Sequence, residues 1–451
     1  MSSLQSVRPN ALSSYFEFER YKTTFNTEVV AGISIYLSLA YIFIVNPAII
    51  SKSGINPSAV LLATVVISAL STIAMGLWAK LPFAVAPGLE MSGFFAFVVV
   101  GTLHMSWQQA LGTVFFSGVL CVIFTSLRVR HNIITSIPIG LKKAIGTSVG
   151  VFVATIGLFL SHILTFAGGR VDFASLSLAS LNTHLAYVLY IGLLLAVILG
   201  LPRLRFRAGL LVSMLVGSFV CYLWGIKAAS PPQLSTDMYQ AIGALDLSVI
   251  FQPNYWSPII VFFVIDFLGG IGKFIGLTAN TNIQDEHGNV PNLQRGLYVD
   301  GAGTIAGSLM GTSSLIAFVE SAVGIEAGGR TGLTAIVCGI LMAGSLVFAP
   351  LLQWVPAEAA AGVLIYVGYL LLPKPSIDKG LSRTEIFDIG IAVAMGLLSL
   401  VTFSLDKAMA LGFWAYFVMG IIDGGKKKEL AWLGGIAAVL TVTIIWQLWV
   451  A

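Results

Sequence analysis

Charged residues are scarce in this sequence, and their scarcity argues against a water-soluble protein. Only 10% of the 451 residues are charged, whereas about a quarter are charged in ordinary soluble domains. Hydrophobic residues make up 57% of the chain, and the mean hydropathy is +0.93. The net charge of +4 says little about nucleic acid, because the excess of Lys and Arg lies in short loops between apolar stretches, and we predict no nucleic-acid partner.

Residues that carry catalysis or bind metals are also few. The three cysteines, Cys121, Cys221 and Cys338, fall inside apolar stretches and show no disulfide or metal-ligand spacing. The five histidines lie in predicted loops or at the ends of predicted spans. The glycine-rich run 269–276 does not continue into the GxxxxGKS or GxxxxGKT pattern of a phosphate-binding loop, so we expect close helix packing there. We predict no enzyme, no metal and no cofactor.

The sequence is rich in apolar stretches that are long enough to cross a membrane. A spanning helix needs about 20 predominantly apolar residues. We predict an all-α polytopic membrane protein, with 1–451 forming one domain and fourteen spans at 27–48, 58–79, 88–103, 108–127, 141–165, 184–201, 208–226, 257–279, 293–311, 318–327, 331–349, 357–372, 385–403 and 407–423. The extra C-terminal segment 430–450 is a fifteenth span or an interfacial helix. Glu28 is interpreted as a helix-start residue of the first span.

The basic residues predict the orientation of the chain, because loops rich in Lys and Arg stay in the cytoplasm. With a cytoplasmic N-terminus, the inside loops hold Lys80, Arg128, Arg130, Lys142, Lys143, Arg203, Arg205, Arg207, Arg295, Arg330, Lys374, Lys379, Arg383, Lys426, Lys427 and Lys428. The outside loops hold mainly Lys52, Arg170, Lys227 and Lys407. We therefore expect a multi-pass protein of the inner (plasma) membrane with its N-terminus in the cytoplasm.

A weak internal repeat relates the two halves of the chain. STIAMGLWAK (71–80) lies over GTIAGSLMGT (303–312) at an offset of 232 residues, and Thr72 matches Thr304. The two repeats cover about 24–226 and about 257–423. Because each repeat holds seven predicted spans, the two run through the membrane in opposite directions. Inverted repeats are typical of secondary transporters with a central binding site.

Predicted spans 3 and 10 are too interrupted to be plain helices. Phe83–Ala86 is held extended by the following Pro87, and a helix can begin at Leu89. In the second segment, two serines precede the β-prone run 315–319, and a short helix follows from Glu320. We predict a strand, a break and a half-helix in both segments, with the half-helix N-termini presented to a ligand. The alternative is two packing kinks.

Four ionisable residues, Asp266, Lys273, Glu90 and Glu320, lie inside predicted spans. Each costs about 2.5 to 3.5 kcal/mol on insertion scales and tends to mark a substrate or ion pathway. Asp266 and Lys273 share one helix face, so Asp266 binds a ligand or proton, or it forms a buried pair with Lys273. Glu90 contacts the ligand or complements the dipole of its own half-helix. Glu320, placed at the repeat equivalent of Gly88, is the strongest ligand candidate.

Four stretches of the chain carry a family resemblance. They are RYKTTFNTEVVAGISIYLSLAYIFIVNPAII, APGLEMSGFFAFVVV, FFVIDFLGGIGKFIGL and GTSSLIAFVESAVGIEAGGRTGLTAIVCG. With them the chain resembles the AzgA-like purine (adenine, guanine and hypoxanthine) permeases of the nucleobase-ascorbate transporter, or xanthine/uracil permease, superfamily. The resemblance implies fourteen spans in two inverted repeats, a core of spans 1–4 and 8–11, a gate of spans 5–7 and 12–14, a homodimer and an elevator-like motion. It also implies that Asp266 and Glu320 bind the substrate.

The chain departs from the family pattern within the presumed pocket. Where the family reads PGMGLNAFF, this chain reads PGLEMSGFF, so Ser92 replaces an asparagine and Glu90 a glycine. Where the family reads VDLFDTAGT, this chain reads IDFLGGIGK, so Gly269 stands for a second aspartate, Gly270 for a threonine and Lys273 for another threonine. The resemblance therefore implies that the chain has the fold of the family but a different substrate pocket.

We predict uptake of a nucleobase, with a purine as the first choice, coupled to a proton carried by Glu320 or Asp266. Sodium is the alternative coupling ion. The predicted substrate site contains Asp266, Glu320, Ser92, Glu90, Gly88, Ser321, Gly269 and Lys273. Two other hypotheses are a carrier or channel for another heterocycle or a small organic or inorganic anion, and a membrane-bound enzyme, for which no catalytic constellation is found.

The two new charges of the pocket are expected to compensate each other. Lys273 and Glu90 both replace small or neutral residues of the family pattern, and each alone is expensive at membrane depth. We therefore predict an ion pair between them. In the rival interpretation, Lys273 faces the ligand and pairs with Asp266 when the site is empty.

Overall fold

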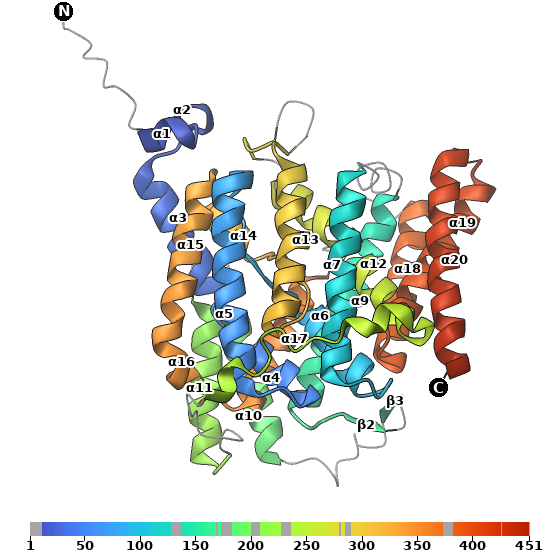
Figure 1. Cartoon of the computed structure of the whole chain (residues 1–451), viewed down its shortest axis with the longest axis horizontal. Coiled ribbons are helices and arrows are strands. Elements are labelled where there is room, and N and C mark those ends of the chain that lie inside the picture. The colour runs from blue at the N-terminus through green and yellow to red at the C-terminus, as the bar shows by residue number, and fades with distance from the viewer. Residues whose placement is uncertain are drawn as a thin grey trace, which may run out of the picture.

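The chain forms a bundle of helices that run mostly along one direction (Figure 1). The computed structural model describes residues 11–127, 137–167, 170–172, 183–199, 208–226, 236–278, 281–284, 290–352, 354–372, 382–424 and 426–450. Of the basic residues used to predict orientation, Arg128, Arg130, Arg203, Arg205, Arg207, Lys227, Lys374 and Lys379 lie outside the described residues.

The helices follow the predicted spans closely. The first half contains α1 (Ala11–Tyr15), α2 (Phe18–Tyr21), α3 (Phe25–Leu39), α4 (Ile42–Ile50), α5 (Pro57–Ala74), α6 (Leu89–Gly93), α7 (Trp107–Ser126), α9 (Ile139–Leu160), α10 (Thr183–Leu199) and α11 (Gly209–Leu223). The second half contains α12 (Trp256–Thr278), α13 (Leu293–Met310), α14 (Ser321–Glu326), α15 (Gly332–Gly344), α16 (Ala349–Leu352), α17 (Ala361–Leu370), α18 (Arg383–Thr402), α19 (Leu405–Ile422) and α20 (Lys427–Val450). The first predicted span is divided into α3 and α4.

Short polar signals fix where several helices begin. Asn56 caps α5, since its side chain accepts from the backbone N–H of Ser58 at 2.8 Å, and Pro57 at the first helical position needs no partner for a missing N–H. Ser106 and Gln109 form a reciprocal capping box at the start of α7. These caps satisfy N–H groups that no helical carbonyl can reach.

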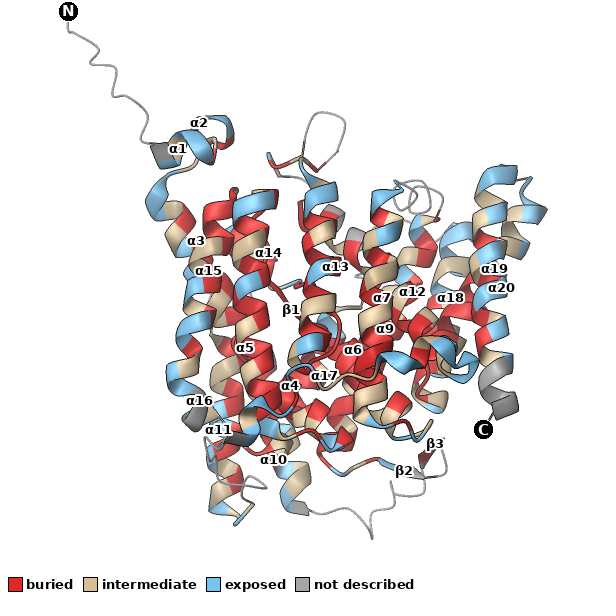
Figure 2. Ribbon diagram, viewed as in Figure 1, coloured by how far each residue is buried: buried red, intermediate tan, exposed pale blue. Residues whose placement is uncertain are grey.

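Among the described residues, seven helical segments are long and apolar enough to cross a membrane, and further apolar helices are shorter. Buried residues fill the interior, whereas exposed residues cover the outer faces (Figure 2). On α18 the outer face is itself apolar. Its exposed large hydrophobic residues, spaced three or four apart, are Ile386, Ile389, Val393, Leu397 and Val401. An apolar stripe of this length is unfavourable in water and suits a lipid environment.

The described helices pack in two groups that meet along the middle of the bundle. One group contains α3, α5, α7, α12, α13, α14 and α15, and the other contains α9, α10, α11, α17, α18, α19 and α20. Glycines allow close approach within the first group: a Cβ at Gly76 would collide with the backbone of Gly332 on α15. Helix α20 lies along α19 and also contacts α12, so the segment 430–450 is a helix of the bundle (Figure 1).

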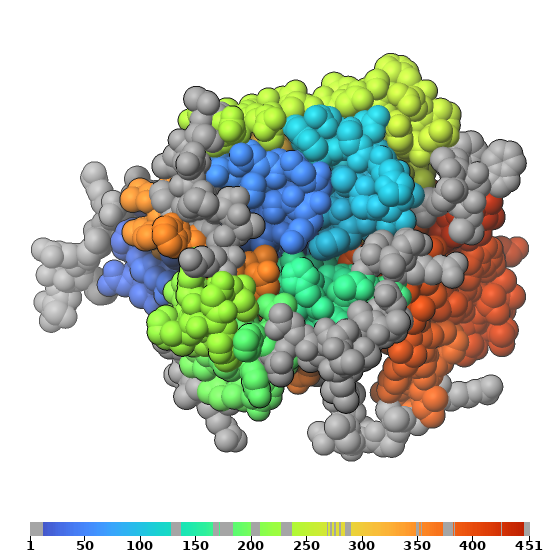
Figure 3. All heavy atoms as spheres, turned by 90° about the horizontal axis from the view of Figure 1, so that it is seen from below, coloured from blue at the N-terminus to red at the C-terminus, as the bar shows by residue number. Residues whose placement is uncertain are grey.

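The connection between the halves runs along one side of the first group. Seen from below, the segment 236–255 lies beside the residues of α5 and α7 (Figure 3). Its backbone is tied to that group, since the N–H of Asp246 donates to the carbonyl of Gln108 at 2.9 Å and the N–H of Gly243 to that of Leu309 at 2.7 Å. The connection therefore packs as part of this group.

An N-terminal arm, residues 11–22, lies against the end of the first group. The hydroxyl of Tyr15 donates to the carbonyl of Leu77 at 2.7 Å, and Lys80 donates to the carbonyl of Tyr15 at 2.8 Å. The Lys80 ammonium also lies 4.2 Å from the centre of the Tyr15 ring. Phe16 and Phe18 are buried against Leu333 of α15. The arm therefore connects the ends of α5 and α15.

Candidate functional site

The two interrupted segments meet in the interior as a pair of short strands. Strand β1 (Val85–Pro87) pairs antiparallel with β4 (Leu315–Ala317), and all their residues are buried. The pair extends on both sides, because the N–H of Gly88 donates to the carbonyl of Ser314 at 3.0 Å and that of Phe318 to the carbonyl of Ala84 at 2.9 Å. Each strand leads into a half-helix, α6 or α14, as predicted. A second two-stranded pair, β2 (Thr165–Ala167) with β3 (Arg170–Asp172), was not predicted.

Two threonines at repeat-equivalent positions hold the outer edges of this strand pair. Thr72 of α5 accepts from the N–H of Val85 at 2.9 Å and donates to its carbonyl at 3.1 Å. Thr304 of α13 accepts from the N–H of Leu315 at 3.0 Å and lies 3.3 Å from its carbonyl oxygen. Unpaired strand edges are not tolerated in an apolar interior, so these hydroxyl groups replace the missing neighbouring strands. We call these two contacts the threonine clamps; the sequence comparison matched both residues without suggesting the role.

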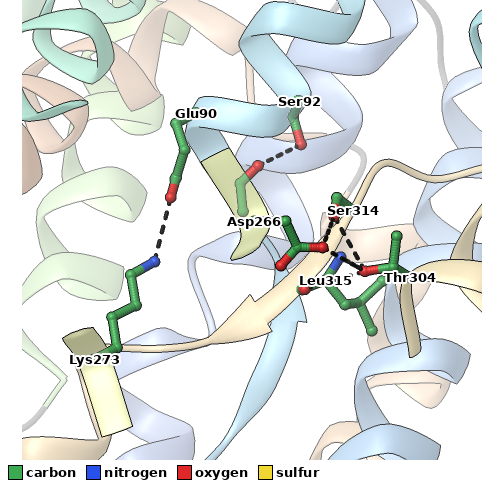
Figure 4. Close-up of polar contacts among 8 residues, drawn as sticks. Glu90, Ser92, Asp266, Lys273, Thr304, Ser314 and Leu315 are labelled. Atoms are coloured by element: carbon green, nitrogen blue, oxygen red, sulfur yellow. Dashed lines mark hydrogen bonds and ion pairs between the residues drawn. The ribbon is translucent and has the colours of Figure 1, made fainter. Parts of the chain in front are cut away.

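The carboxylate of Asp266 supports the second clamp. Its Oδ2 accepts from the hydroxyl of Ser314 at 2.7 Å and from that of Thr304 at 3.2 Å, and the residue is 1% exposed (Figure 4). Asp266 on α12 therefore anchors the start of β4. The alternative of a buried pair between Asp266 and Lys273 is not favoured, because the Lys273 ammonium pairs with Glu90.

Ser92 belongs to a second buried network. Its hydroxyl donates to Oδ1 of Asn46 at 2.5 Å and lies 2.7 Å from the hydroxyl of Ser313. The amide of Asn46 in turn donates to Thr64 at 2.8 Å and to Thr312 at 3.0 Å. This network joins α4, α5 and α6 to the residues before β4. Asn46 was not identified from the sequence, although an asparagine inside the apolar first span was an available signal.

Glu90 and Lys273 form the predicted ion pair. The Lys273 ammonium donates to Oε1 of Glu90 at 3.2 Å, and their side chains are 18% and 10% exposed (Figure 4). Glu90 lies in the first turn of α6, and the side chain of Lys273 extends from α12 toward it. The pair therefore joins one helix from each half of the chain, and the rival interpretation, in which Lys273 pairs with Asp266 in the empty site, is not favoured.

Glu320 lies at the start of α14 and is partly exposed. It accepts a hydrogen bond from the hydroxyl of Tyr41 at 2.6 Å, and it lies within electrostatic range of Glu90 and Lys273. Tyr41 occupies the break between α3 and α4, where the sequence showed only a tyrosine in an apolar span. Glu320, Glu90, Lys273 and Tyr41 therefore form one polar group, which we call the central cluster.

The two half-helix carboxylates occupy matching positions in their repeats. Glu90 follows the clamped Val85 by five residues, and Glu320 follows the clamped Leu315 by five residues. Measured from the clamps, the counterpart of Glu320 is Glu90, not Gly88 as the sequence offset suggested. The offset is 232 residues at the threonines and 230 at the strands, because the connection after α13 is shorter.

Of the remaining predicted site residues, some contact the paired strands and one borders open space. A Cβ at Gly88 would come 2.7 Å from Cδ1 of Ile316, so Gly88 packs closely against the side chain of that strand residue. The hydroxyl of Ser321 accepts from the N–H of Ala84 at 3.0 Å and is fully buried. A Cβ at Gly269 would meet no atom within 4 Å. Gly270 is buried.

Glu28 has a larger role than that of a helix-start residue. Its fully buried carboxylate accepts from the hydroxyl of Thr23 at 2.8 Å and from that of Thr334 at 2.6 Å. It also accepts from the backbone N–H groups of Arg330 at 3.0 Å and Thr331 at 3.1 Å. Glu28 thus fastens α3 to the turn between α14 and α15. Within the described part of the chain, no three His, Cys, Asp or Glu residues are grouped as a metal site.

Comparison with known proteins supplies the family. A model of the xanthine/uracil permeases, described as a permease family, matches residues 26–405. The chain belongs to this permease family. The permease is therefore a transporter and not an enzyme, and its apolar helices make it a multi-pass membrane protein.

Relatives of this permease match it over nearly their whole length. The adenine permease AdeQ of Escherichia coli (strain K12) is 32% identical over 98% of this chain and 97% of its own. The guanine/hypoxanthine permease PbuG of Bacillus subtilis (strain 168) is 30% identical over 93% of this chain and 96% of its own. The transmembrane domain of a cyanobacterium bicarbonate transporter, BicA, superposes with a TM-score of 0.67 at 14% identity, covering 88% of this chain and 98% of that domain. At that identity, BicA shows the fold alone.

Proposed function

We propose that this permease imports a nucleobase, with a purine as the first choice, and that the substrate binds at the central cluster. The relatives named as adenine and guanine/hypoxanthine permeases support this substrate class. The observation that carries the proposal is the position of Glu320 at a half-helix start, partly exposed and beside Tyr41, Glu90 and Lys273. A carboxylate is an acceptor that suits the N–H groups on the edge of a planar base.

The charges around the site favour a neutral base over an anion. Lys273 is paired with Glu90, so its charge is compensated. Two further carboxylates, Glu320 and Asp266, accept hydrogen bonds from hydroxyl groups. Carboxylates would repel an anion, whereas a heterocycle with N–H donors can bind to Glu320. The alternative of an anion carrier on the same scaffold is therefore less favoured.

The proposed transport cycle is alternating access through an elevator-like motion of the first helix group against the second. The proposal includes fourteen spans in two inverted repeats, a core of spans 1–4 and 8–11 and a gate of spans 5–7 and 12–14, with α20 as an additional span. The matching threonine clamps and the two packed helix groups support this arrangement. We also propose a homodimer in the plasma membrane with a cytoplasmic N-terminus.

Proton coupling is assigned to Glu320, with Asp266 as the alternative carrier and sodium as the alternative ion. Burial disfavours the charged form of a carboxyl group, so a proton is a natural co-substrate there. Asp266 is already held by two hydroxyl groups, which leaves Glu320 as the more accessible carrier. Uptake is expected to fall as the external pH rises.

Binding of nucleobases and small anions to the purified permease tests the proposal. We expect adenine or hypoxanthine to raise the melting temperature and to drive saturable uptake in cells that lack their own nucleobase carriers. Glu320→Gln should weaken binding by about tenfold or more, because a charged acceptor is replaced by a neutral amide. Glu326→Gln, on the exposed end of the same half-helix, is the matched control. Stabilisation by anions alone would refute a nucleobase substrate.

A further inference from the structure

The Lys273 ammonium has donors to spare. A lysine ammonium carries three N–H donors. Among the described residues, the structure records one acceptor for it, Oε1 of Glu90 at 3.2 Å. The side chain is 18% exposed, so it is not sealed inside the protein. The free donors can therefore reach a molecule in the central cluster.

Open space lies beside Lys273 on the same helix. Asp266, Gly269 and Lys273 stand at positions i, i+3 and i+7 of α12, which places them on one face. Glycine within a helix costs about 1 kcal/mol relative to alanine and is usually explained by close packing. Gly76 has that explanation, but a Cβ at Gly269 would meet no atom within 4 Å. The glycine thus leaves space without any packing need in this structure.

The central cluster offers both an acceptor and a donor to a substrate. Glu320 provides the acceptor, and Lys273, held by Glu90, provides the donor. We propose that Lys273 is a direct substrate contact and that the space at Gly269 makes the site selective for an oxo-substituted heterocycle, whose carbonyl oxygen accepts from Lys273 while its ring N–H groups donate to Glu320. This inference rests on the proposed function. Glu90 acts as a positioning residue that orients the ammonium and offsets its charge.

The arrangement discriminates between closely related bases. Hypoxanthine carries a carbonyl oxygen where adenine carries an amino group. Placed against Lys273, the oxygen accepts a hydrogen bond, whereas the amino group brings a donor against a donor. A hydrogen bond to a charged group contributes about 1.5 to 3 kcal/mol, so hypoxanthine is expected to bind roughly ten to a hundred times more tightly than adenine.

Binding measurements on the purified full-length permease test the role of Lys273. Isothermal titration with hypoxanthine and adenine is performed on wild type, Lys273→Met and the double variant Lys273→Met/Glu90→Gln. Removing one partner of a buried pair destabilises a protein, whereas neutralising both is often tolerated, so the double variant keeps the test valid if the single variant fails to fold. We expect the hypoxanthine Kd of the double variant to rise roughly ten- to a hundredfold while the adenine Kd changes little. Lys52→Thr, an exposed lysine, is the control.

A second variant tests the open space. Gly269→Leu should block binding of both bases and leave the melting temperature unchanged, because its side chain enters space that the protein does not use. Gly344→Leu is the matched control, since a Cβ at this exposed helical glycine also meets no atom within 4 Å. The inference is overturned if the folded double variant binds hypoxanthine as wild type does, or if Gly269→Leu binds normally. If wild type binds neither base, the proposed function fails instead.

Discussion

The threonine clamps allow a quantitative test of how broken backbone is stabilised in the interior of this permease. Thr72→Val keeps the shape of the side chain and removes the hydroxyl. The N–H of Val85 then loses its acceptor and the carbonyl of Val85 loses its donor. Both groups face away from the partner strand, so β4 cannot replace the lost bonds.

The expected loss follows from the cost of unpaired polar groups. A buried donor or acceptor left without a partner costs about 1 to 3 kcal/mol, so two such groups cost about 2 to 6 kcal/mol. We expect the melting temperature of purified Thr72→Val to fall by several degrees. The variant Thr304→Val should lose at least as much stability, because the hydroxyl of Thr304 also contacts Asp266 and Ser314.

The variant Thr72→Ser distinguishes the contribution of the hydroxyl to stability from that of the methyl group. Thr72→Ser keeps the hydroxyl and should remain close to wild type, apart from the loss of one buried methyl, roughly 1 kcal/mol. The assay is thermal unfolding followed by size-exclusion chromatography in one detergent for all variants. The reasoning is refuted if Thr72→Val has the melting temperature of the wild type. It is also refuted if Thr72→Ser loses as much stability as Thr72→Val, because the hydroxyl then does not support the strand.

Three further changes test other contacts. Glu28→Gln puts a donor amide against backbone N–H groups, so we expect a loss of about 2 to 4 kcal/mol in thermal unfolding; an unchanged midpoint would contradict the fastening role. Tyr41→Phe removes the hydroxyl that donates to Glu320 and should change nucleobase affinity in titration by up to about tenfold, whereas identical affinity would leave Tyr41 outside the site. Lys80→Met removes both contacts to Tyr15, so limited proteolysis should cut the N-terminal arm faster; equal cutting rates would argue against the contact.

The sequence was sufficient for features that depend on local chemistry. Hydropathy located the long apolar helices, because a spanning segment must be apolar over its length. Pro87 and the glycine after it predicted the end of β1 and the start of α6 at Leu89. Charge compensation predicted the contact between Glu90 and Lys273, since neither charge alone is favourable at that depth.

Features that depend on contacts between distant segments were beyond the sequence. Tyr41 and Glu320 are 279 positions apart, and only the packed structure brings the phenol to the carboxylate. Ser92 replaces an asparagine of the family pattern, and only the packed structure shows that its hydroxyl bonds to Asn46. The connection from the clamp threonine to the clamped strand is also two residues shorter in the second repeat, which an ungapped comparison cannot detect.

The carboxylates of Glu90 and Glu320 occupy equivalent positions in the two repeats but have different hydrogen-bond partners. Glu90 and Glu320 stand five residues beyond their clamped strands, but one faces an ammonium and the other a phenol. Breaking a buried ion pair is expected to cost about 3 to 5 kcal/mol, so we expect Glu90 to keep its partner through the proposed transport cycle. A single hydrogen bond to a carboxylate contributes about 1.5 to 3 kcal/mol, and the N–H of a base can replace the hydroxyl of Tyr41 at little net cost. Under the proposed function, we therefore expect Glu320 to exchange Tyr41 for the substrate, whereas Glu90 holds Lys273 in place.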